Sequence, residues 1–474
     1  MSIQELLLMR HEWALILLVL AMLVLELGFS EQNKTNSITA ASILFAVVTL
    51  LGFLPSGTGS TFGGMYVASP VRILMKNILN LGVLIVFLQS GSWLRTKPNY
   101  NRVTEFYLLV LSSVIGLNFM ISAGHFLMFY LGLELLTIPI TAASSYEQYK
   151  SKSAEAGIKL ILSSAFSSAI LLFGISMLYG TMGSLYFHDM QAAMELPQVL
   201  GFVFFFSGLA FKISIVPFHL WTADVYEGSP TSVTSYLSVV SKGAAIFMLI
   251  LILTTIFEPL RPVWQQVLYG AAIFTMTIGN LFAIRQQNLK RFLAFSSIAQ
   301  AGFILLGMIG GSALGTASVL YFVLVYVFSN LAAFGVVMAI EQSAGKVDLK
   351  DYNGLYKTNP RLSLVMMLAL FSLAGIPPLA GFFGKFFLFA AAAESGYYVL
   401  LFIAVINAVI SLYYYLLVVK AMFIIKSDMP IGYFQSDYPT RMALSACVIG
   451  ILALGFYSPV FEYIQGLCLT YFNP

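Results

Sequence analysis

Five ionisable side chains stand inside long apolar runs of this sequence, where charge is costly. They are Glu134 in HFLMFYLGLELLTIPITAASSY, Lys159 in GIKLILSSAF, Lys212 in GFVFFFSGLAFKISIVPFHLW, Lys242 in SKGAAIFMLILIL and Lys385 in LAGIPPLAGFFGKFFLF. A lysine changes its protonation state readily, because burial and like charge disfavour the charged form whereas a nearby acid favours it. Arginine stays protonated. Because every basic residue of this set is a lysine, the pattern favours proton transfer over anchoring.

A buried ion pair that locks two helices together is the competing interpretation. A charge at the centre of a bilayer costs at least ~2.5–3.5 kcal/mol, so these groups must face the interior of a helix bundle. One acid cannot neutralise four lysines, which disfavours a purely structural role. Movement of Glu134 would bias Lys212 between holding and releasing a proton. His219 could relay protons between Lys212 and Lys242, or could make a structural hydrogen bond.

Prolines accompany three of these groups. Pro139 follows Glu134 by five residues, Pro217 follows Lys212 by five, and Pro377-Pro378 precede Lys385. Proline frees a backbone carbonyl, and freed groups at membrane depth are tolerated only where protein or water satisfies them. Broken helices beside charged groups are typical of ion sites in transporters.

The elements that position these groups are membrane helices. Of 474 residues, 59% are hydrophobic and 9% charged, whereas soluble domains carry roughly 25% charged residues. With ~20 residues per span, we predict an all-α polytopic protein of about 14 spans. They cover residues 11–29, 37–55, 68–90, 105–122, 125–146, 157–181, 197–220, 230–255, 262–284, 290–310, 314–340, 361–393, 396–424 and 440–466.

The loop charges support this count. If successive loops lie on alternate sides of the membrane, sixteen basic residues fall on one side and only Arg10 and Arg261 on the other. This asymmetry indicates that the basic side is cytoplasmic. Both termini would then face the outer, periplasmic side of a bacterial inner membrane. The start carries Glu5 and Glu12 in place of a basic leader, so a first span over 13–29 is expected to be retained. Arg72 and Lys76, early in the third span, are expected to snorkel toward the interface.

No metal, nucleotide or nucleophile motif stands out. Cys447 and Cys468 match no metal or haem spacing and are interpreted as small residues facing lipid or other helices. Gly57, Gly59, Gly63 and Gly64 are loop glycines without the strand–turn–helix context of a phosphate loop.

Several stretches carry a family resemblance. They are EFYLLVLSSVIGLNFM (105–120), FYLGLELLTIPI (129–140), EAGIKLILSSAFSSAILLFGISMLYG (155–180), FKISIVPFHLWTADVYEGSPTSV (211–233), NLKRFLAFSSIAQAGFILLG (288–307), LAGIPPLAGFFGKFFLF (373–389) and VINAVISLYYYLLVVKAMF (405–423). With these the chain resembles the antiporter-like membrane subunits of respiratory complex I, the proton-pumping NADH–quinone oxidoreductase. The stretch HLWTADVYEGSPT differs from the HTWLPDAH-type version usual in subunits L and M and in multisubunit sodium/proton antiporters.

The resemblance implies a role for each buried group. Glu134 matches a fifth-helix glutamate, Lys212 the lysine of a broken seventh helix, Lys242 a central eighth-helix lysine and Lys385 the lysine of a broken twelfth helix. Lys159 matches a sixth-helix lysine that modulates the first pair. The implied fold has an N-terminal three-helix segment (1–104), two inverted five-helix repeats (105–255 and 262–424), each with one broken helix, and a C-terminal helix (425–474).

Two positions depart from the family pattern. Gln300 stands where the family commonly has a histidine, so a connection there would run through water and hydroxyls such as Ser296 and Ser297. Ala223 replaces a common proline, which alters only the loop.

The resemblance also implies partners. Other membrane subunits and the lipid bilayer would surround this chain in a heteromultimer, with no nucleic acid. No cofactor is expected in this chain, and NADH, FMN, iron–sulfur clusters and quinone would bind in partner subunits. The remaining alternatives are a subunit of a multisubunit cation/proton antiporter and an inert assembly scaffold.

Overall fold

The computed structural model describes residues 3–28, 34–55 and 57–472, and most of them are helical. Among these residues, 13 helices are long and apolar enough to cross a membrane. A fourteenth crossing consists of two shorter helices joined end to end, so the predicted all-α fold of about 14 spans is confirmed. The predicted first span, 13–29, overlaps the helix Arg10–Gly28, and its last residue, Phe29, lies outside the described residues.

The N-terminal segment comprises α1 (Ile3–Leu8), α2 (Arg10–Gly28), α3 (Lys34–Gly52), β1 (Gly59–Thr61), β2 (Tyr66–Ala68), α4 (Pro70–Leu94) and the short α5 (Lys97–Tyr100). The two strands form an antiparallel pair with Gly59 opposite Ala68. The loop glycines of the sequence therefore belong to a small hairpin outside the helix bundle.

The next five crossings are α6 (Val103–Ile121), α7 (Phe126–Ser144), α8 (Ser151–Met182), the broken pair α9 (Leu196–Ile213) and α10 (Leu220–Gly228), and α11 (Thr231–Tyr236) continued through a π-helical segment (Leu237–Ser241) into α12 (Lys242–Thr255). Five further crossings are α13 (Arg261–Ile284), α14 (Leu289–Ile309), α15 (Ala313–Ala344), the broken pair α17 (Pro360–Ala374) and α18 (Ala380–Glu394), and α19 (Tyr398–Phe423), with the short α16 (Leu355–Thr358) before α17. The chain ends with α20 (Tyr438–Phe456) and α21 (Pro459–Phe472).

The two groups of five crossings have the same internal order. In each group the third helix, α8 or α15, is 32 residues long, and the fourth crossing is broken. The repeats predicted at 105–255 and 262–424, and their relation by inversion, stay predictions.

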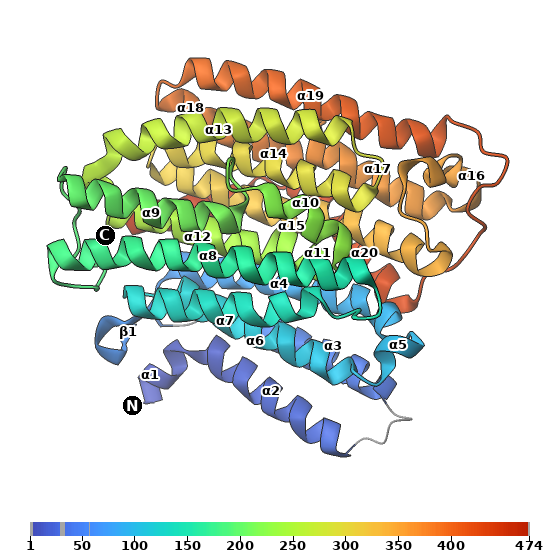
Figure 1. Cartoon of the computed structure of the whole chain (residues 1–474), viewed down its shortest axis with the longest axis horizontal. Coiled ribbons are helices and arrows are strands. Elements are labelled where there is room, and N and C mark those ends of the chain that lie inside the picture. Colours follow the sequence, from blue (N-terminus) through green and yellow to red (C-terminus); the bar gives the residue numbers. More distant parts are fainter. Residues whose placement is uncertain (1–2, 29–33, 56, 473–474) are drawn as a thin grey trace.

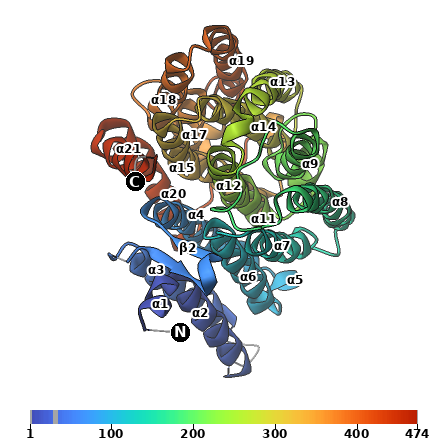
Figure 2. The same ribbon diagram turned by 90° about the vertical axis from the view of Figure 1, so that its left-hand side faces the viewer.

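The helices lie side by side as one bundle (Figure 1). Seen along the bundle, α1 to α3 lie at one edge, α18 and α19 lie at the opposite edge, and α12 and α15 lie between them (Figure 2). Both ends of the chain lie at the same end of the bundle, whereas α5, α16 and the connection from α19 to α20 lie at the other (Figure 1). The second end carries basic residues such as Arg95, Lys97 and Lys357.

Both breaks end a helix in the same way. At the end of α9, Ser214 adopts the left-handed conformation (φ 67°) and the Ile215 N–H donates to the Ala210 carbonyl at 2.9 Å. At the end of α17, Gly375 is left-handed (φ 88°) and the Ile376 N–H donates to the Phe371 carbonyl at 3.0 Å. This is the Schellman motif. It turns the chain out of the helix axis in mid-bundle and leaves further carbonyls of the last turn available to other donors.

Ser214 carries a side chain where glycine is preferred, which costs roughly 1–2 kcal/mol. The Thr222 hydroxyl donates to Ser214 Oγ at 2.7 Å, and the Trp221 indole N–H donates to the Phe211 carbonyl at 3.0 Å. Both donors belong to α10, so the second half of the broken helix holds the first half in its strained turn.

Close packing of α6 on α7 positions Glu134. A Cβ on Gly116 would lie 2.3 Å from the Leu136 nitrogen, and a Cβ on Gly132 would lie 2.5 Å from the Met120 nitrogen. Small residues allow membrane helices to approach this closely.

We expect Gly132→Val to force α6 and α7 apart and to destabilise the protein by about 1–3 kcal/mol, the range for overpacked cores. The measurement is the thermal unfolding of the purified assembly in detergent. Gly180→Val on α8 is the matched control, because no atom lies within 4 Å of a Cβ there. Equal stability of the two variants would contradict this account of the α6–α7 contact.

Candidate functional site

Lys212 of α9 contacts a threonine of α7 that shares a helix face with Glu134. Lys212 is 8% exposed, and its ammonium donates to Thr137 Oγ1 at 3.0 Å. Thr137 lies three residues after Glu134 and hence on the same face of α7. Glu134 and Lys212 do not form an ion pair with each other within 4 Å. The Oε1 atom of Glu134 is buried without a hydrogen-bond partner. The acid is therefore near enough to bias Lys212 without neutralising it in direct contact.

Lys242 begins α12 directly after the π-helical segment Leu237–Ser241. Its side chain is 3% exposed, its ammonium donates to Ser297 Oγ at 2.7 Å, and it lies 5.6 Å from the centre of the Tyr226 ring. A π-helical turn holds one residue more than an α-helical turn and is frequent at functional sites. The sequence did not indicate this segment, because serine and valine at 237–241 are compatible with an ordinary helix.

Lys385 lies on α18 and reaches back to the end of α17. Its side chain is 4% exposed, and its ammonium donates to the Ala374 carbonyl at 3.0 Å. The Phe303 ring centre lies 4.6 Å from Nζ. The carboxyl end of a helix carries partial negative charge, so the break supplies both a hydrogen-bond acceptor and a favourable field for this cation.

Gln300 lies between the surroundings of Lys242 and Lys385. Its amide donates to the Leu373 carbonyl at 3.0 Å and to the Tyr415 hydroxyl at 3.2 Å, and Leu373 directly precedes the Ala374 carbonyl that binds Lys385. A cavity of about 10 Å³ is lined by Lys242, Ser297 and Gln300, which is enough for about one water. The Ser296 hydroxyl bonds the Tyr415 hydroxyl at 2.5 Å. The hydroxyls and the space for water that were expected around Gln300 are therefore both present.

Lys159 differs from the expected buried lysine. Its side chain is 41% exposed, and it forms ion pairs with Glu155 at 2.7 Å and Asp224 at 2.6 Å. Asp224 also pairs with Arg291 at 2.6 Å. The reason is the length of α8, which begins at Ser151 and leaves Lys159 only two turns from its first residue. The sequence argument that one acid faces four lysines was wrong, because this lysine has acids of its own.

His219 directly precedes α10, within the turn of the broken helix. It is half-buried, its Nδ1 is buried without a hydrogen-bond partner, and within the described residues it bonds neither Lys212 nor Lys242. The relay role stays a prediction that direct contacts do not support.

Arg72 and Lys76 were expected to reach the membrane interface, and this expectation was wrong. Both are buried, at 5% and 1% exposure. Lys76 pairs with the buried Glu12 of α2 at 2.5 Å, and the Tyr66 hydroxyl donates to Glu12 at 2.9 Å. The signal that could have found this pair was an acid in the first span and a lysine two turns into the third. Their separation of 64 positions in the sequence concealed their contact.

Among the described residues, no group of three histidine, cysteine, aspartate or glutamate side chains could hold a metal ion. Cys447 and Cys468 are both buried. The polar chemistry of the bundle thus centres on Lys212, Lys242 and Lys385.

In the described part of the chain, the long apolar helices and the two crossings broken beside Lys212 and Lys385 define a polytopic membrane protein with the build of an ion transporter. A family model described as "NADH:quinone oxidoreductase/Mrp antiporter, TM" matches residues 123–411. NADH-quinone oxidoreductase subunit N of Phocaeicola vulgatus is 52% identical over 468 residues, which cover 98% of this chain and 99% of the relative. The corresponding subunit N of Azobacteroides pseudotrichonymphae is 49% identical over 471 residues, covering 98% of each chain. The chain belongs to the NADH-quinone oxidoreductase subunit N family.

Solved structures agree with this assignment. A chain of respiratory complex I from Thermus thermophilus superposes with a TM-score of 0.80 at 30% identity, over 95% of this chain and 98% of that chain. A chain of the Mrp complex from Dietzia sp. superposes with a TM-score of 0.87 at 20% identity, over 99% of this chain and 97% of that chain. The second likeness shows a shared fold.

The geometry at Lys212 predicts that Thr137→Val slows proton movement several-fold, because valine keeps the shape of threonine but cannot accept the ammonium hydrogen bond. The measurement is proton uptake driven by NADH in inside-out membrane vesicles, divided by the rate of NADH oxidation. Thr141→Val is the control, since the Thr141 hydroxyl bonds only the Thr137 carbonyl. Equal ratios in the two variants would contradict a role for the Lys212–Thr137 hydrogen bond in proton movement.

Proposed function

We propose that this chain moves protons across the membrane along Glu134, Lys212, Lys242 and Lys385, as a membrane subunit of an NADH–quinone oxidoreductase. The observation that carries the proposal is the nature of the partners of the three buried lysines. Each ammonium binds an uncharged oxygen, from Thr137, Ser297 or Ala374.

An uncharged partner allows both protonation states. A hydroxyl accepts a hydrogen bond from an ammonium and can rotate to donate one to a neutral amine, which fits Thr137 and Ser297. A carbonyl still accepts from a neutral amine, which fits Ala374. A carboxylate in direct contact would instead favour the charged form and hold the proton. The three lysines are therefore suited to gain and lose protons in turn.

The sites follow one another through the bundle. The charge of Glu134 biases Lys212, and the water-sized cavity joins Lys242 to Gln300, whose amide borders the Ala374 turn that binds Lys385. Gln300 itself does not titrate, so the proton passes it on water and on the hydroxyls of Ser297 and Tyr415. Lys159 modulates the first pair from its ion pair with Asp224, and His219 adjoins the turn after Lys212.

The energy for transport comes from elsewhere in the assembly. Similarity to subunit N implies a heteromultimer in which partner subunits bind NADH, FMN, iron–sulfur clusters and quinone, and in which quinone reduction drives this chain through its neighbours. The setting is a bacterial inner membrane. The basic end of the bundle faces the cytoplasm and both termini face the periplasm.

We expect the Lys242→Arg and Lys385→Arg variants to assemble and to oxidise NADH. The part of the proton-to-NADH ratio that this subunit contributes is expected to fall at least about tenfold. Arginine keeps the charge but does not release its proton. The measurement is the initial proton uptake per NADH in inside-out vesicles. Lys420→Arg, on the exposed surface of α19, is the matched control.

Three results would contradict the proposal. Ratios equal to wild type in Lys212→Ala and Lys242→Ala, with the assembly intact, would rule out transport on these lysines. A sodium-dependent growth defect with normal NADH-driven pumping would instead favour the cation/proton antiporter. Loss of assembly without any specific pumping defect would favour a scaffold.

A further inference from the structure

A buried arginine lines a pocket at the end of the bundle where both ends of the chain lie (Figure 1). Arg72 lies in the first turn of α4 and is 5% exposed. Its Nη1 donates to the Ala123 carbonyl at 2.8 Å and lies 3.5 Å from the Val67 carbonyl, whereas its Nε is buried without a hydrogen-bond partner. Among the residues that the structure describes, no acid pairs with this guanidinium.

The charge of Arg72 is a stronger demand than that of a buried lysine. A lysine can shed its proton and become neutral, whereas arginine stays protonated. A charge taken out of water is costly unless an opposite charge accompanies it. Lys76, one turn further along α4, has such a partner in Glu12 at 2.5 Å. Arg72 therefore calls for an anion from outside the described chain.

The pocket beside Arg72 is roomy and lacks acids. Its volume is about 330 Å³, which corresponds to on the order of ten waters. Asp189, which follows a lining histidine, already pairs with His188 at 3.1 Å and accepts from the Ser184 hydroxyl at 3.0 Å. The polar side chains that line the pocket are those of Arg72, His188, Gln191, Thr255 and Tyr471. This lining is suited to a negatively charged ligand.

The glycines of the hairpin shape one wall of the pocket. Gly64, between strands β1 and β2, lines the pocket. A Cβ on Gly124 would lie 2.3 Å from the Gly64 carbonyl, so the connection from α6 to α7 packs directly on the hairpin. The same connection carries the Ala123 carbonyl that holds Arg72. The guanidinium is thus oriented before any ligand arrives, which lowers the cost of binding.

The length of α4 places Arg72 at the level of the membrane surface. The helix has 25 residues and is therefore about 37 Å long, whereas the hydrocarbon core of a bilayer is about 30 Å thick. Its first turn, which carries Arg72, is at the end of this length. Phosphate groups of lipids lie at this level, next to the hydrocarbon core.

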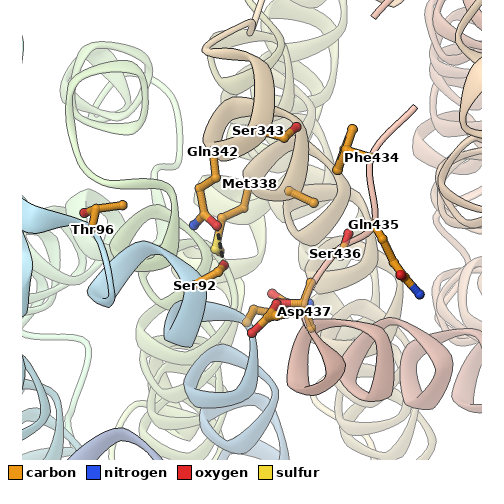
Figure 3. Close-up of a pocket in the computed structure, with 12 residues that line it drawn as sticks. Ser92, Thr96, Met338, Gln342, Ser343, Phe434, Gln435, Ser436 and Asp437 are labelled. Atoms are coloured by element: carbon orange, nitrogen blue, oxygen red, sulfur yellow. Dashed lines mark hydrogen bonds between the residues drawn. The ribbon is translucent and has the colours of Figure 1, made fainter. Parts of the chain in front are cut away.

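A second pocket, at the opposite end of the bundle, lacks an unmatched charge. It lies between the last turns of α4, the last turns of α15 and the segment that leads into α20, and Gln89 and Ser92 line it (Figure 3). Figure 3 shows Ser92 joined to Gln342 by a hydrogen bond, with Asp437 on the neighbouring wall. Asp437 lies 3.5 Å from Arg95, and the other lining side chains are neutral. Only the pocket at Arg72, of these two, requires an ion.

We infer that the pocket at Arg72 binds a phosphate group, carried by a phospholipid headgroup or by free phosphate. Guanidinium N–H donors match the spacing of phosphate oxygens, and the Tyr471 hydroxyl and the Gln191 amide can donate to further oxygens. A single carboxylate from a neighbouring subunit would meet the charge but would fill little of the pocket. This site goes beyond the proposed proton transport and does not depend on it.

Protection of Arg72 from chemical modification tests the site in the intact assembly. The assembly is washed in detergent until it is free of lipid phosphorus and is then treated with phenylglyoxal, which modifies arginine. Mass spectrometry follows the modification of Arg72 and of Arg261, a control at the same end of the bundle that pairs with Glu258. The probes are inorganic phosphate, compared with chloride at equal ionic strength, and phosphatidylglycerol micelles, compared with diacylglycerol micelles. We expect a phosphate-bearing probe to slow the modification of Arg72 at least about fivefold by mass action and to leave Arg261 unchanged.

Each outcome bears on the inference. Protection by phosphatidylglycerol alone assigns a headgroup site, and protection by inorganic phosphate, alone or in addition, assigns a site that accepts the free anion. Either result supports the inference. Equal rates with each probe and its comparison would overturn it. An Arg72 that reacts under no condition would be covered by a neighbouring subunit, which would overturn it as well.

A tyrosine variant tests whether the anion occupies this pocket. Tyr471→Phe removes a lining hydroxyl and keeps the ring, so we expect the probe concentration for half-protection of Arg72 to rise several-fold. Tyr463→Phe is the matched control, because Tyr463 lies on the same helix α21 and is 62% exposed. The same half-protection concentration in both variants would place the anion outside this pocket and overturn the inference.

Discussion

Ammonium groups held by uncharged oxygens in an apolar interior are the constraint on which the rest of this bundle depends. Such a contact requires an oxygen that the helices do not use themselves. The broken helix supplies it at Lys385 through the Ala374 carbonyl, and hydroxyls on neighbouring helices supply it at Lys212 and Lys242. The left-handed turn at Gly375 leaves the Ala374 carbonyl free for Lys385, and the close α6–α7 packing fixes the helix that carries Thr137. An unbroken helix through this turn would use that carbonyl in its own hydrogen bonds and leave Lys385 without this partner.

The N-terminal segment uses buried charge differently. Glu12 and Lys76 contact one another directly, and Tyr66 bonds the acid. Direct contact between opposite charges favours both charged forms, and removing either partner would leave an uncompensated buried charge. This pair therefore joins α2 to α4 and holds its charges constant, in contrast to the three lysines that have neutral partners. One chain thus contains buried lysines with a charged partner and buried lysines with uncharged partners.

Most of the architecture follows from the sequence because lipid imposes simple rules. Span length, loop charge and the Gly375-Ile376-Pro377-Pro378 interruption were sufficient to predict fourteen crossings and a break before Lys385. Depth along a helix was harder to predict, as Lys159 shows, because hydropathy does not reveal how far α8 extends beyond the membrane. The pairing of residues distant in sequence, such as Glu12 and Lys76, could not be predicted, because each residue alone is compatible with an interfacial position. The pocket beside Gln89 was missed for a related reason, since its walls come from three helices and no single stretch identifies it.

The π-helical segment at 237–241 has a consequence for the phase of the helix that follows it. An α-helix advances about 100° per residue, because it has 3.6 residues per turn, whereas a π turn accommodates one more residue in about the same rotation. Every residue from Lys242 onward therefore lies about 100° behind the position that an uninterrupted α-helix would give it. Winding the same residues as a plain α-helix would turn the whole of α12 on its axis relative to α11, even with every side chain retained. The winding of this stretch is therefore a property in its own right, separate from the identity of the residues within it.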